Sequence, residues 1–284
     1  MVEIAKEEII DNVQKDTIKA IEINKKNKEK KDVESMVRDH LRGFSRTVPS
    51  FLMAYGDENT TLSNFDKIVP DNVFKEVTGI TLDQFRFLRD GGMYDDEDTG
   101  EYKQFKGNLF DEVVFNDSVK EFMSRKDKLS RYFEEDLDED IFDYIPPQQT
   151  NQIYTPKETV KEMVDLLEEN NPGCFEDDTK TFADLYMKSG LYITEIVKRL
   201  YRNPVMKSKY PNDIERLKHI FKYQVYGLAP TEIIYRIALN FILGFDKNGD
   251  ITDYNLKCFD TVILSKEGIL EEKLDEIFGV NNNE

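Results

Sequence analysis

The fold is decided by the stretch Phe182-Ala183-Asp184-Leu185-Tyr186-Met187-Lys188-Ser189-Gly190-Leu191-Tyr192. A short apolar run ends on the carboxylate of Asp184, and apolar residues recur at helical spacing after Gly190. The pattern predicts a buried strand, a tight turn and a helix, which is the ligand-binding corner of an open α/β sheet. Lys188 occupies a position where a second glycine is expected, because glycine lets a backbone approach a ligand closely.

Strands and helices alternate through the second half of the chain. We expect strands over 181–184, 224–228 and 258–263, and helices over 156–169, 190–202, 213–222, 230–241 and 270–278. Thr155 is expected to cap the first of these helices. Alternation of this kind predicts a parallel sheet with helices packed on it.

The first half of the chain has a different pattern and is expected to be mainly helical. The pattern predicts a helix over 2–39, helix starts at 61–65 and 81–85, a flexible acidic loop over 91–100, a strand over 110–115 and a helix from 117 onward. Two consecutive prolines, Pro146 and Pro147, end this half. We therefore predict two domains, 1–145 and 146–284, and an α/β fold class.

Charge is distributed unevenly along the chain. The net charge is −18, and an evenly acidic surface would repel nucleic acid. Residues 181–240 nevertheless hold ten Lys/Arg against five Asp/Glu. This segment is either a solvated face or a basic patch for a polyanion. If it is a patch, the candidate nucleic-acid contacts are Lys188, Lys198, Arg199 and Arg202.

The two cysteines, Cys174 and Cys258, have no metal-ligand spacing, which predicts a reduced, cytoplasmic protein. The charged N-terminus does not resemble a signal peptide, and no apolar run reaches the length of a membrane span. We expect no membrane partner and no metal site. The acidic residues of 246–250 and the Glu-x-Lys at 101–103 are interpreted as a turn and as a coincidence of composition.

Three segments, in this order, resemble the adenine-specific DNA methyltransferases that modify the exocyclic amine. They are Thr150-Asn151-Gln152-Ile153-Tyr154-Thr155-Pro156, the corner with Asp184 and Gly190, and Val225-Tyr226-Gly227-Leu228. Longer stretches, among them HLRGFSRTVPSFLMAYGDENTTL and IFDYIPPQQTNQIYTPK, are similar to one region of large restriction–modification proteins. In those proteins the region follows a DEAD-box-type helicase motor, and the likeness extends from about Val37 onward.

The resemblance implies a Rossmann-like methyltransferase sheet of about three parallel strands, truncated because the sequence stops after the third. It implies S-adenosylmethionine as the cofactor, bound by Tyr154, Thr155, Pro156, Asp184, Ser189, Gly190, Gly227 and Glu232. It also implies DNA and the helicase or other portions of a restriction–modification enzyme as partners. In such a sheet we expect the exposed strand edge to be covered by residues 110–115, a second copy or an absent portion of the parent protein.

The sequence departs from the methyltransferase pattern at several positions. Leu185 replaces the expected proline, Lys188 replaces a glycine, and the second strand is followed by no acid until Glu232. The base-binding motif Asn/Asp-Pro-Pro-Tyr/Phe does not occur in the 284 residues, nor does an ATPase phosphate loop. One lost cofactor contact costs about 1–3 kcal/mol. Losing the group that positions the reacting amine raises the activation barrier by about 7–11 kcal/mol.

These departures leave three hypotheses. The first is a methyltransferase-like binding and coupling module of a restriction–modification enzyme, with no catalytic residue of its own and weakened or lost cofactor binding. The second is an S-adenosylmethionine-dependent adenine methyltransferase whose site is completed by another chain. The third is a protein–protein interaction domain without a ligand.

Overall fold

The computed structural model describes residues 41, 43–96, 99–134, 137, 139–146 and 154–279. The chain divides into two compact units, Met1–Arg46 and Thr47–Glu284. The predicted helix over 2–39 lies outside the described residues. The predicted domain boundary between residues 145 and 146 falls within the second unit and stays a prediction.

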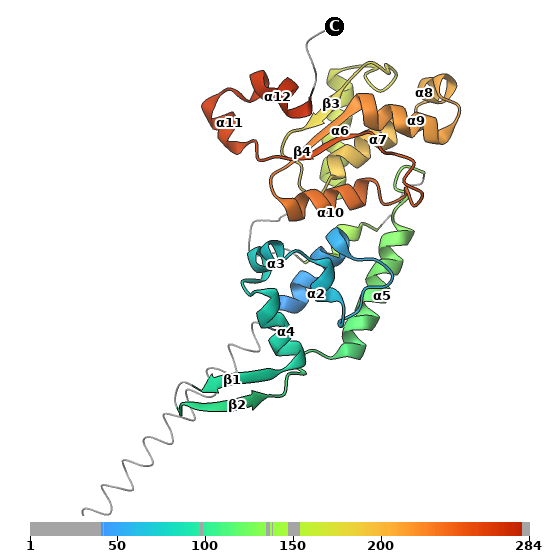
Figure 1. Ribbon diagram of the computed structural model, residues 1–284. Helices are drawn as coiled ribbons and strands as arrows, with labels where there is room; N and C mark the ends of the chain where they lie inside the picture. The colour runs from blue at the N-terminus through green and yellow to red at the C-terminus, as the bar shows by residue number, and fades with distance from the viewer. Residues whose placement is uncertain are drawn as a thin grey trace, which may run out of the picture. The chain divides into compact units, whose positions relative to one another are not determined.

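Helices predominate among the described residues of the first half, beginning with a helix that ends at Tyr55 (Figure 1). They are α2 (Phe65–Ile68), α3 (Asp71–Thr78), α4 (Leu82–Asp90), α5 (Glu112–Lys128) and the 3-10 turn η1 (Ile141–Tyr144). Thr81 caps α4: its hydroxyl accepts from Gln84 N at 3.2 Å, and the Gln84 side chain accepts from Thr81 N at 2.9 Å. This reciprocal pair satisfies two donors at the helix start and confirms the helix predicted there.

Four phenylalanines form the core of these helices. Phe51, Phe65, Phe74 and Phe85 are fully buried. Phe74 lies 5.5 Å from both Phe51 and Phe85, measured between ring centroids, and Phe65 lies 6.0 Å from Phe85. Burial of large aromatic side chains is the main source of stability for such short helices, which are marginal in isolation.

A β-hairpin replaces the flexible acidic loop predicted over 91–100. Strands β1 (Gly92–Asp96) and β2 (Glu101–Phe105) pair antiparallel. The Phe87 ring of α4 stacks on Phe105 at 5.0 Å and meets Tyr94 edge-on at 6.4 Å. The loop prediction was wrong because this aromatic support outweighs the low strand propensity of the acidic residues.

The prediction of a strand over 110–115 was also wrong. The Asp111 carboxylate accepts from Val114 N at 3.0 Å and caps α5, so the chain is helical from Glu112. Phe110 and Phe115 pack on Phe85 and Phe65 in the helical core. Residues 110–115 therefore do not cover an edge of the parallel sheet.

The second half contains a three-stranded parallel sheet in the order β3-β4-β5, which confirms the α/β class. Its strands are β3 (Phe182–Asp184), β4 (Val225–Ala229) and β5 (Asn255–Cys258). The helices of this half are α6 (Lys157–Asn170), α7 (Leu191–Arg202), α8 (Pro204–Lys209), α9 (Asp213–His219), the π-helix η2 (Ile220–Gln224), α10 (Glu232–Ile242), α11 (Val262–Glu267) and α12 (Leu270–Phe278). In register, Asp184 is opposite Gly227 and Ala229 is opposite Cys258.

Helix α10 contacts both the sheet and the helical segments of the first half (Figure 1). It packs on β4 and β5, while α7 packs on β3 and β4. The Asn240 amide on α10 donates to Ala54 O at 2.7 Å, and the Tyr132 hydroxyl donates to Ile242 O at 3.0 Å. Within the second unit, α10 thus links the sheet to the preceding helices.

Three predicted boundaries in the second half need correction. The structure puts Pro156, not Thr155, at the N-cap of α6, with no side-chain cap bond. Helix α9 ends at His219 and passes into the π-helix η2, where a continuous helix to residue 222 was predicted. The third strand covers Asn255–Cys258 instead of 258–263, because α11 already begins at Val262.

Candidate functional site

The carboxyl ends of the three parallel strands form one edge, which we call the carboxyl edge. Backbone bonds hold its loops together: Met187 N donates to Leu228 O at 2.8 Å, and Phe259 N donates to Ala229 O at 2.8 Å. The Thr261 hydroxyl adds a bond to Leu185 O at 2.8 Å. The loop after β3 is therefore tied to β4 and to the segment that follows β5, at the edge where open α/β sheets bind ligands.

Asp184 is the last residue of β3 and lies half-buried at this edge. Burial raises the pKa of its carboxyl, and a bond from Tyr186 N to Oδ1 at 3.2 Å opposes that rise. Burial thus disfavours the ionised form of Asp184, a shift of the kind that functional sites often show.

The turn between β3 and α7 is held by Ser189 and Gly190. Ser189 Oγ accepts from Leu191 N at 3.2 Å, as expected of a hydroxyl that caps the following helix. Gly190 has φ +84°, a left-handed conformation that favours glycine. An added Cβ would lie 2.8 Å from Ile242 Cδ1 of α10, so Gly190 serves the close packing of two helices.

The space above Gly227 is filled by protein side chains. An added Cβ there would lie 2.9 Å from Met187 Sδ and 2.9 Å from Leu256 Cδ2. Met187 is fully buried, so its thioether covers the middle of β4. The next residue, Lys188, is half-buried and its ammonium lies 5.8 Å from the centre of the Tyr186 ring. The turn therefore contributes the buried thioether of Met187 and the half-buried ammonium of Lys188.

Glu232 is the first residue of α10, beyond the end of β4. Thr231 precedes it and caps the helix. One carboxylate oxygen of Glu232 accepts from Arg236 Nε at 2.8 Å, one turn along the same helix. The other carboxylate oxygen can accept from a ligand, so Glu232 supplies an acceptor at the carboxyl edge.

Tyr154, Thr155 and Pro156 lead directly into α6. The Tyr154 ring lies 4.7 Å from Phe142, which in turn lies 4.9 Å from Phe241 of α10. Burial raises the pKa of the Tyr154 phenol to about 12. The tyrosine therefore belongs to an aromatic cluster near the C-terminal end of α10.

The four basic candidates differ in how far they reach solvent. Lys198 is 8% exposed and pairs with Glu195 at 3.4 Å. Arg199 bridges three carboxylates, at 2.5 Å to Asp165, 2.8 Å to Glu195 and 3.1 Å to Glu168. Arg202 Nε donates to Phe133 O at 2.9 Å.

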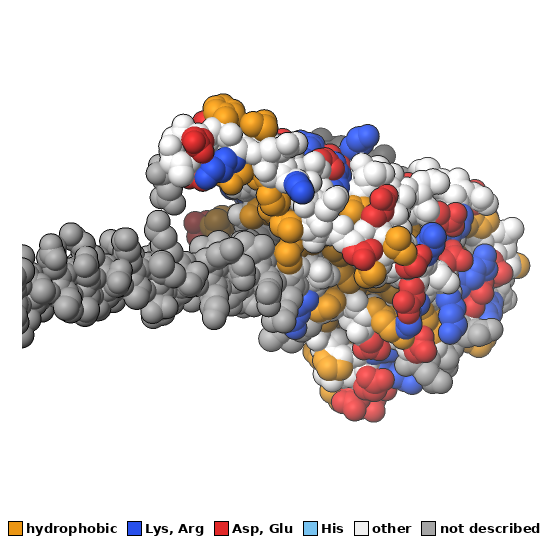
Figure 2. All heavy atoms as spheres, turned by 90° about the horizontal axis from the view of Figure 1, so that it is seen from below, with side chains coloured by type: hydrophobic (Ala, Val, Ile, Leu, Met, Phe, Trp, Pro, Cys, Tyr) orange, Lys and Arg blue, Asp and Glu red, His pale blue; other side chains and the backbone are white. Residues whose placement is uncertain are grey.

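These bonds use basic groups inside the protein to join α7 to its neighbours. Figure 2 shows acidic and basic side chains interspersed over the face in view, without a continuous basic surface. The assignment of these residues to nucleic acid stays a prediction. The ammonium of the fourth candidate, Lys188, lies 5.8 Å from the centre of the Tyr186 ring.

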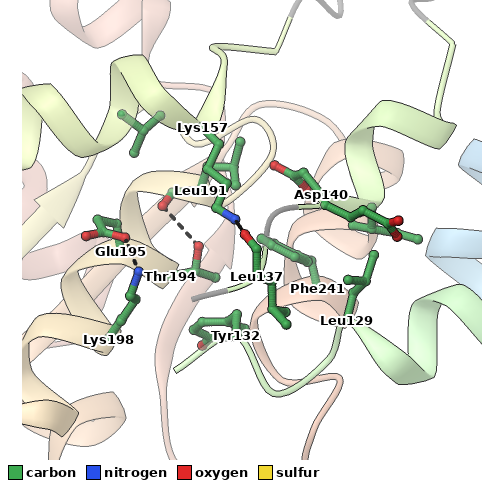
Figure 3. A pocket seen from close by; sticks show the side chains of 13 residues that line it. Leu129, Tyr132, Leu137, Asp140, Lys157, Leu191, Thr194, Glu195, Lys198 and Phe241 are labelled. Carbon is green, nitrogen blue, oxygen red and sulfur yellow. Dashed lines mark hydrogen bonds and ion pairs between the residues drawn. The ribbon is translucent and has the colours of Figure 1, made fainter. Parts of the chain in front are cut away.

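The cavity of Figure 3 lies beside α7. Its volume is about 40 Å³, and its lining includes Tyr132, Asp140, Lys157, Leu191 and Phe241. Its polar groups are bonded to each other or to the backbone, as where Lys157 Nζ donates to Leu137 O. A space of this size holds a few water molecules and no cofactor.

A larger hollow of about 410 Å³ lies at the opposite end of β3, lined by Cys174, Lys180 and Phe182 among others. None of the predicted cofactor residues lines either space. Both cysteines are free, and the described residues contain no cluster of side chains suited to a metal ion. Nor does any helix among them have the length and apolar character to cross a membrane.

Tyr55 is a residue of interest that the sequence did not indicate. Its hydroxyl is buried and lacks a hydrogen-bond partner among the described residues. Its pKa is raised to about 12, first by burial and then by the charge of Glu232. Nothing in the stretch Ala54-Tyr55-Gly56 marks it, since the charges that act on its phenol come from α3, α10 and the end of β5.

Comparison with known proteins adds no relative: no family model, no curated protein and no solved structure matches this chain. The site is therefore defined by its own geometry.

Proposed function

We propose that the second half of the chain is a Rossmann-like, methyltransferase-like module of a restriction–modification enzyme that engages DNA or another part of that enzyme. One observation carries the proposal: the half-buried carboxyl of Asp184 ends β3, directly before the turn whose left-handed Gly190 begins α7. A carboxylate at this position suits the ammonium group of an amino-acid cofactor.

The side chains at the carboxyl edge fit an adenosyl cofactor at its two polar ends. Asp184 offers an acceptor for an ammonium group, and Glu232 offers one for ribose hydroxyls. Such a cofactor, S-adenosylmethionine, would supply an activated methyl group. At the turn the fit is poorer, because Met187 covers Gly227 and the Lys188 cation would face a cationic sulfonium. We therefore propose weakened binding.

Methyl transfer by this chain alone is not part of the proposal. The 284 residues contain no Asn/Asp-Pro-Pro-Tyr/Phe, the motif that would bind the target amine. Without such a group, the orientation of amine and methyl donor that makes the reaction fast is not provided. The module is proposed to bind and to couple, with no catalytic residue.

A specific observation supports each of the two other hypotheses. The under-solvated carboxyl of Asp184 favours a retained cofactor site that another chain completes. The protein side chains that fill the space at Gly190 and Gly227 favour an interaction domain without a ligand. The three hypotheses differ in ligand binding and in methyl transfer, so one set of measurements separates them.

Calorimetric titration with S-adenosylmethionine and S-adenosylhomocysteine tests the proposal, together with DNA binding at 50 and 200 mM salt. We expect weak binding of the adenosyl ligands, salt-sensitive DNA binding and no methyl transfer to duplex DNA. Methyl transfer by the isolated chain would replace the proposal with an active enzyme. Absence of both adenosyl and DNA binding would leave the interaction domain.

A further inference from the structure

The hairpin of β1 and β2, at the C-terminal end of α4 in Figure 1, has one face on that helix and one exposed face. On the first face, the Phe87 ring of α4 contacts Tyr94 of β1 and Phe105 of β2. Side chains alternate between the two faces of a strand, so the other face holds two cross-strand pairs, which we call the outer face. The pairs are Met93–Gln104 and Asp95–Tyr102, and all four residues are exposed.

Two large side chains with apolar surface lie next to each other on the outer face. Met93 is 56% exposed and Tyr102 is 71% exposed. They hold diagonal positions across the two strands, where backbones are about 7–8 Å apart and long side chains come within reach of each other. Single exposed apolar residues are common, but two adjoining ones on a face of four form a patch that a partner can cover.

The backbone of β1 is also available for pairing on one side. In the described part of the chain this sheet has two strands, so β1 pairs with β2 alone. Its other edge can bond an extended segment through N–H and C=O groups, and the strand Gly92–Asp96 contains no proline or lysine to block the edge. A two-stranded hairpin is only marginally stable by itself, so a third strand would strengthen it.

Charge determines which kind of segment fits this edge. Residues 93–104 include five acidic residues and one basic residue, Lys103. Lys103 forms an ion pair with Asp96 on the face toward α4, whereas Asp95 is exposed on the outer face. Nucleic acid and a second copy of this hairpin carry charge of the same sign and would be repelled. A segment rich in lysine or arginine is attracted instead.

We propose that β1 binds an extended, basic segment of another protein as a third strand of the hairpin. Along β1 the apolar side chains of Met93 and Tyr94 are followed by the acidic Asp95 and Asp96. An antiparallel partner strand runs the other way, so its matching sequence is two basic residues followed by two apolar ones. Its apolar side chains pack beside Met93, and a basic side chain pairs with Asp95. All these residues lie outside the proposed cofactor site, so either proposal can fail without the other.

The probe is a synthetic peptide with this pattern, acetyl-Thr-Lys-Arg-Val-Ile-Thr-amide, titrated into the full chain. One control peptide has glutamate in place of both basic residues. A second control peptide carries N-methyl groups on the alternate backbone nitrogens that face β1 in the proposed pairing. It keeps every side chain and loses the backbone donors that strand addition needs.

The protein variants are Met93→Thr and Asp95→Asn, and each has a matched control elsewhere on the surface. Ile263→Thr removes an exposed apolar side chain from α11, and Glu272→Gln removes an exposed carboxylate from α12. Asp95→Asn keeps the backbone and the apolar surface, so it tests the charge even if Met93→Thr loosens the hairpin.

We expect the peptide to bind the wild-type chain, more weakly as salt rises, and to slow hydrogen exchange of the amides of Gly92–Asp96. Met93→Thr should weaken binding about five- to tenfold, and Asp95→Asn about two- to threefold, as for one exposed charge pair. Both control variants should bind like the wild type. The glutamate and N-methyl peptides should bind at least about tenfold more weakly than the probe.

Several results would overturn the inference. Failure of the wild-type chain to bind the probe, or equal binding of the N-methyl peptide, would exclude a third strand on β1. Equal losses for Asp95→Asn and Glu272→Gln would show general attraction to an acidic chain. A dimer that Met93→Thr converts to a monomer would assign the outer face to a second copy, and DNA binding weakened by Met93→Thr would assign it to nucleic acid.

Discussion

Gly190 at the start of α7 lies against Ile242 at the end of α10, so closely that an added Cβ would be 2.8 Å from Ile242 Cδ1. The glycine therefore sets the distance between the two helices that pack on the sheet. Gly190 also ends the turn that carries Lys188. Both the packing of the two helices and the shape of the candidate site therefore depend on Gly190.

Substitution of Gly190 by alanine should destabilise the protein for two separable reasons. The left-handed backbone costs about 1–2 kcal/mol for a residue with a Cβ, and overpacking against Ile242 costs about 1–3 kcal/mol. Gly268→Ala is the control, because Gly268 has φ +72° and no atom within 4 Å of an added Cβ. Urea unfolding should show a larger loss of stability for Gly190→Ala than for Gly268→Ala. Adding Ile242→Ala to Gly190→Ala should not recover the stability lost through the left-handed backbone. Equal losses at the two glycines would contradict the packing role.

Asp184→Asn should stabilise the chain at neutral pH and weaken ligand binding. Because the pKa of Asp184 is raised on folding, the folded state holds more protons than the unfolded state from the ordinary carboxyl pKa up to the raised one. Stability is therefore lost as pH rises through that window, and the cost persists at pH 7. Asparagine can still accept from Tyr186 N without the charge.

The expected gain is about 1 kcal/mol, typical of removing a charge that a binding site keeps at the expense of stability. Urea unfolding at pH 3 and pH 7 should show a difference between Asp184→Asn and wild type that grows with pH. A variant less stable than wild type at pH 7 would mean that the folded protein stabilises the charge.

The lowered pKa of Lys126 predicts that stability changes with pH in the opposite direction. Its ammonium donates to Met53 O at 3.3 Å, and burial lowers its pKa to about 8, with a further contribution from Lys247. Between pH 8 and the ordinary lysine pKa the unfolded state holds more protons, so stability rises with pH there. Lys126→Met removes this dependence.

The stability advantage of Lys126→Met over wild type should shrink by on the order of 2 kcal/mol between pH 7 and pH 10. Lys247→Gln is the second variant: removing its charge should raise the folded-state pKa of Lys126 and so narrow the window from its lower end. Unfolding curves of the three proteins across this range measure the effect. A pH-independent difference between Lys126→Met and wild type would show that the lysine is solvated.

Arg199 is expected to matter for the fold more than for nucleic acid. Its guanidinium joins Asp165 and Glu168 of α6 to Glu195 of α7, and Glu195 is only 9% exposed. Arg199→Ala leaves these carboxylates without their partner and should cost about 2 kcal/mol, less than the loss of a fully buried pair. Lys273→Ala breaks an exposed pair with Glu276, which solvent screens, and should cost much less. Equal small effects of both substitutions would show that the Arg199 network is solvated.

The sequence predicted those elements that local chemistry determines. Helix α12 has the predicted bounds of 270–278, and β3 and α7 start one residue after their predicted starts. The helix start predicted at 81–85 is confirmed by α4, which Thr81 caps. In each case an apolar period or a cap residue lies within the element itself.

The errors arise where distant residues decide the structure. The hairpin β1-β2 is supported by the Phe87 ring of α4, which packs against it. The burial of the unbonded Tyr55 hydroxyl is set by residues far along the chain. For the basic residues of α7, a charge count does not show which acids are near, so the sequence left a solvated face and a basic patch both open. Lys198 and Arg199 pair with Glu195 of their own helix, three and four residues earlier, and Arg199 reaches two more acids on α6.

Lys188→Gly tests what the turn does to a cofactor. The Lys188 ammonium lies over the Tyr186 ring, and a neighbouring sulfonium would be a like charge. S-adenosylhomocysteine has a neutral sulfur, so the wild-type chain should bind it more tightly than S-adenosylmethionine. Lys188→Gly should reduce that preference about tenfold, which corresponds to one charge contact of about 1.4 kcal/mol, and should improve S-adenosylmethionine binding. Lys180→Gly is the control, since Lys180 lines the hollow at the opposite end of β3. If calorimetry finds the same ratio of the two affinities in wild type and Lys188→Gly, the lysine does not face the sulfur of the ligand.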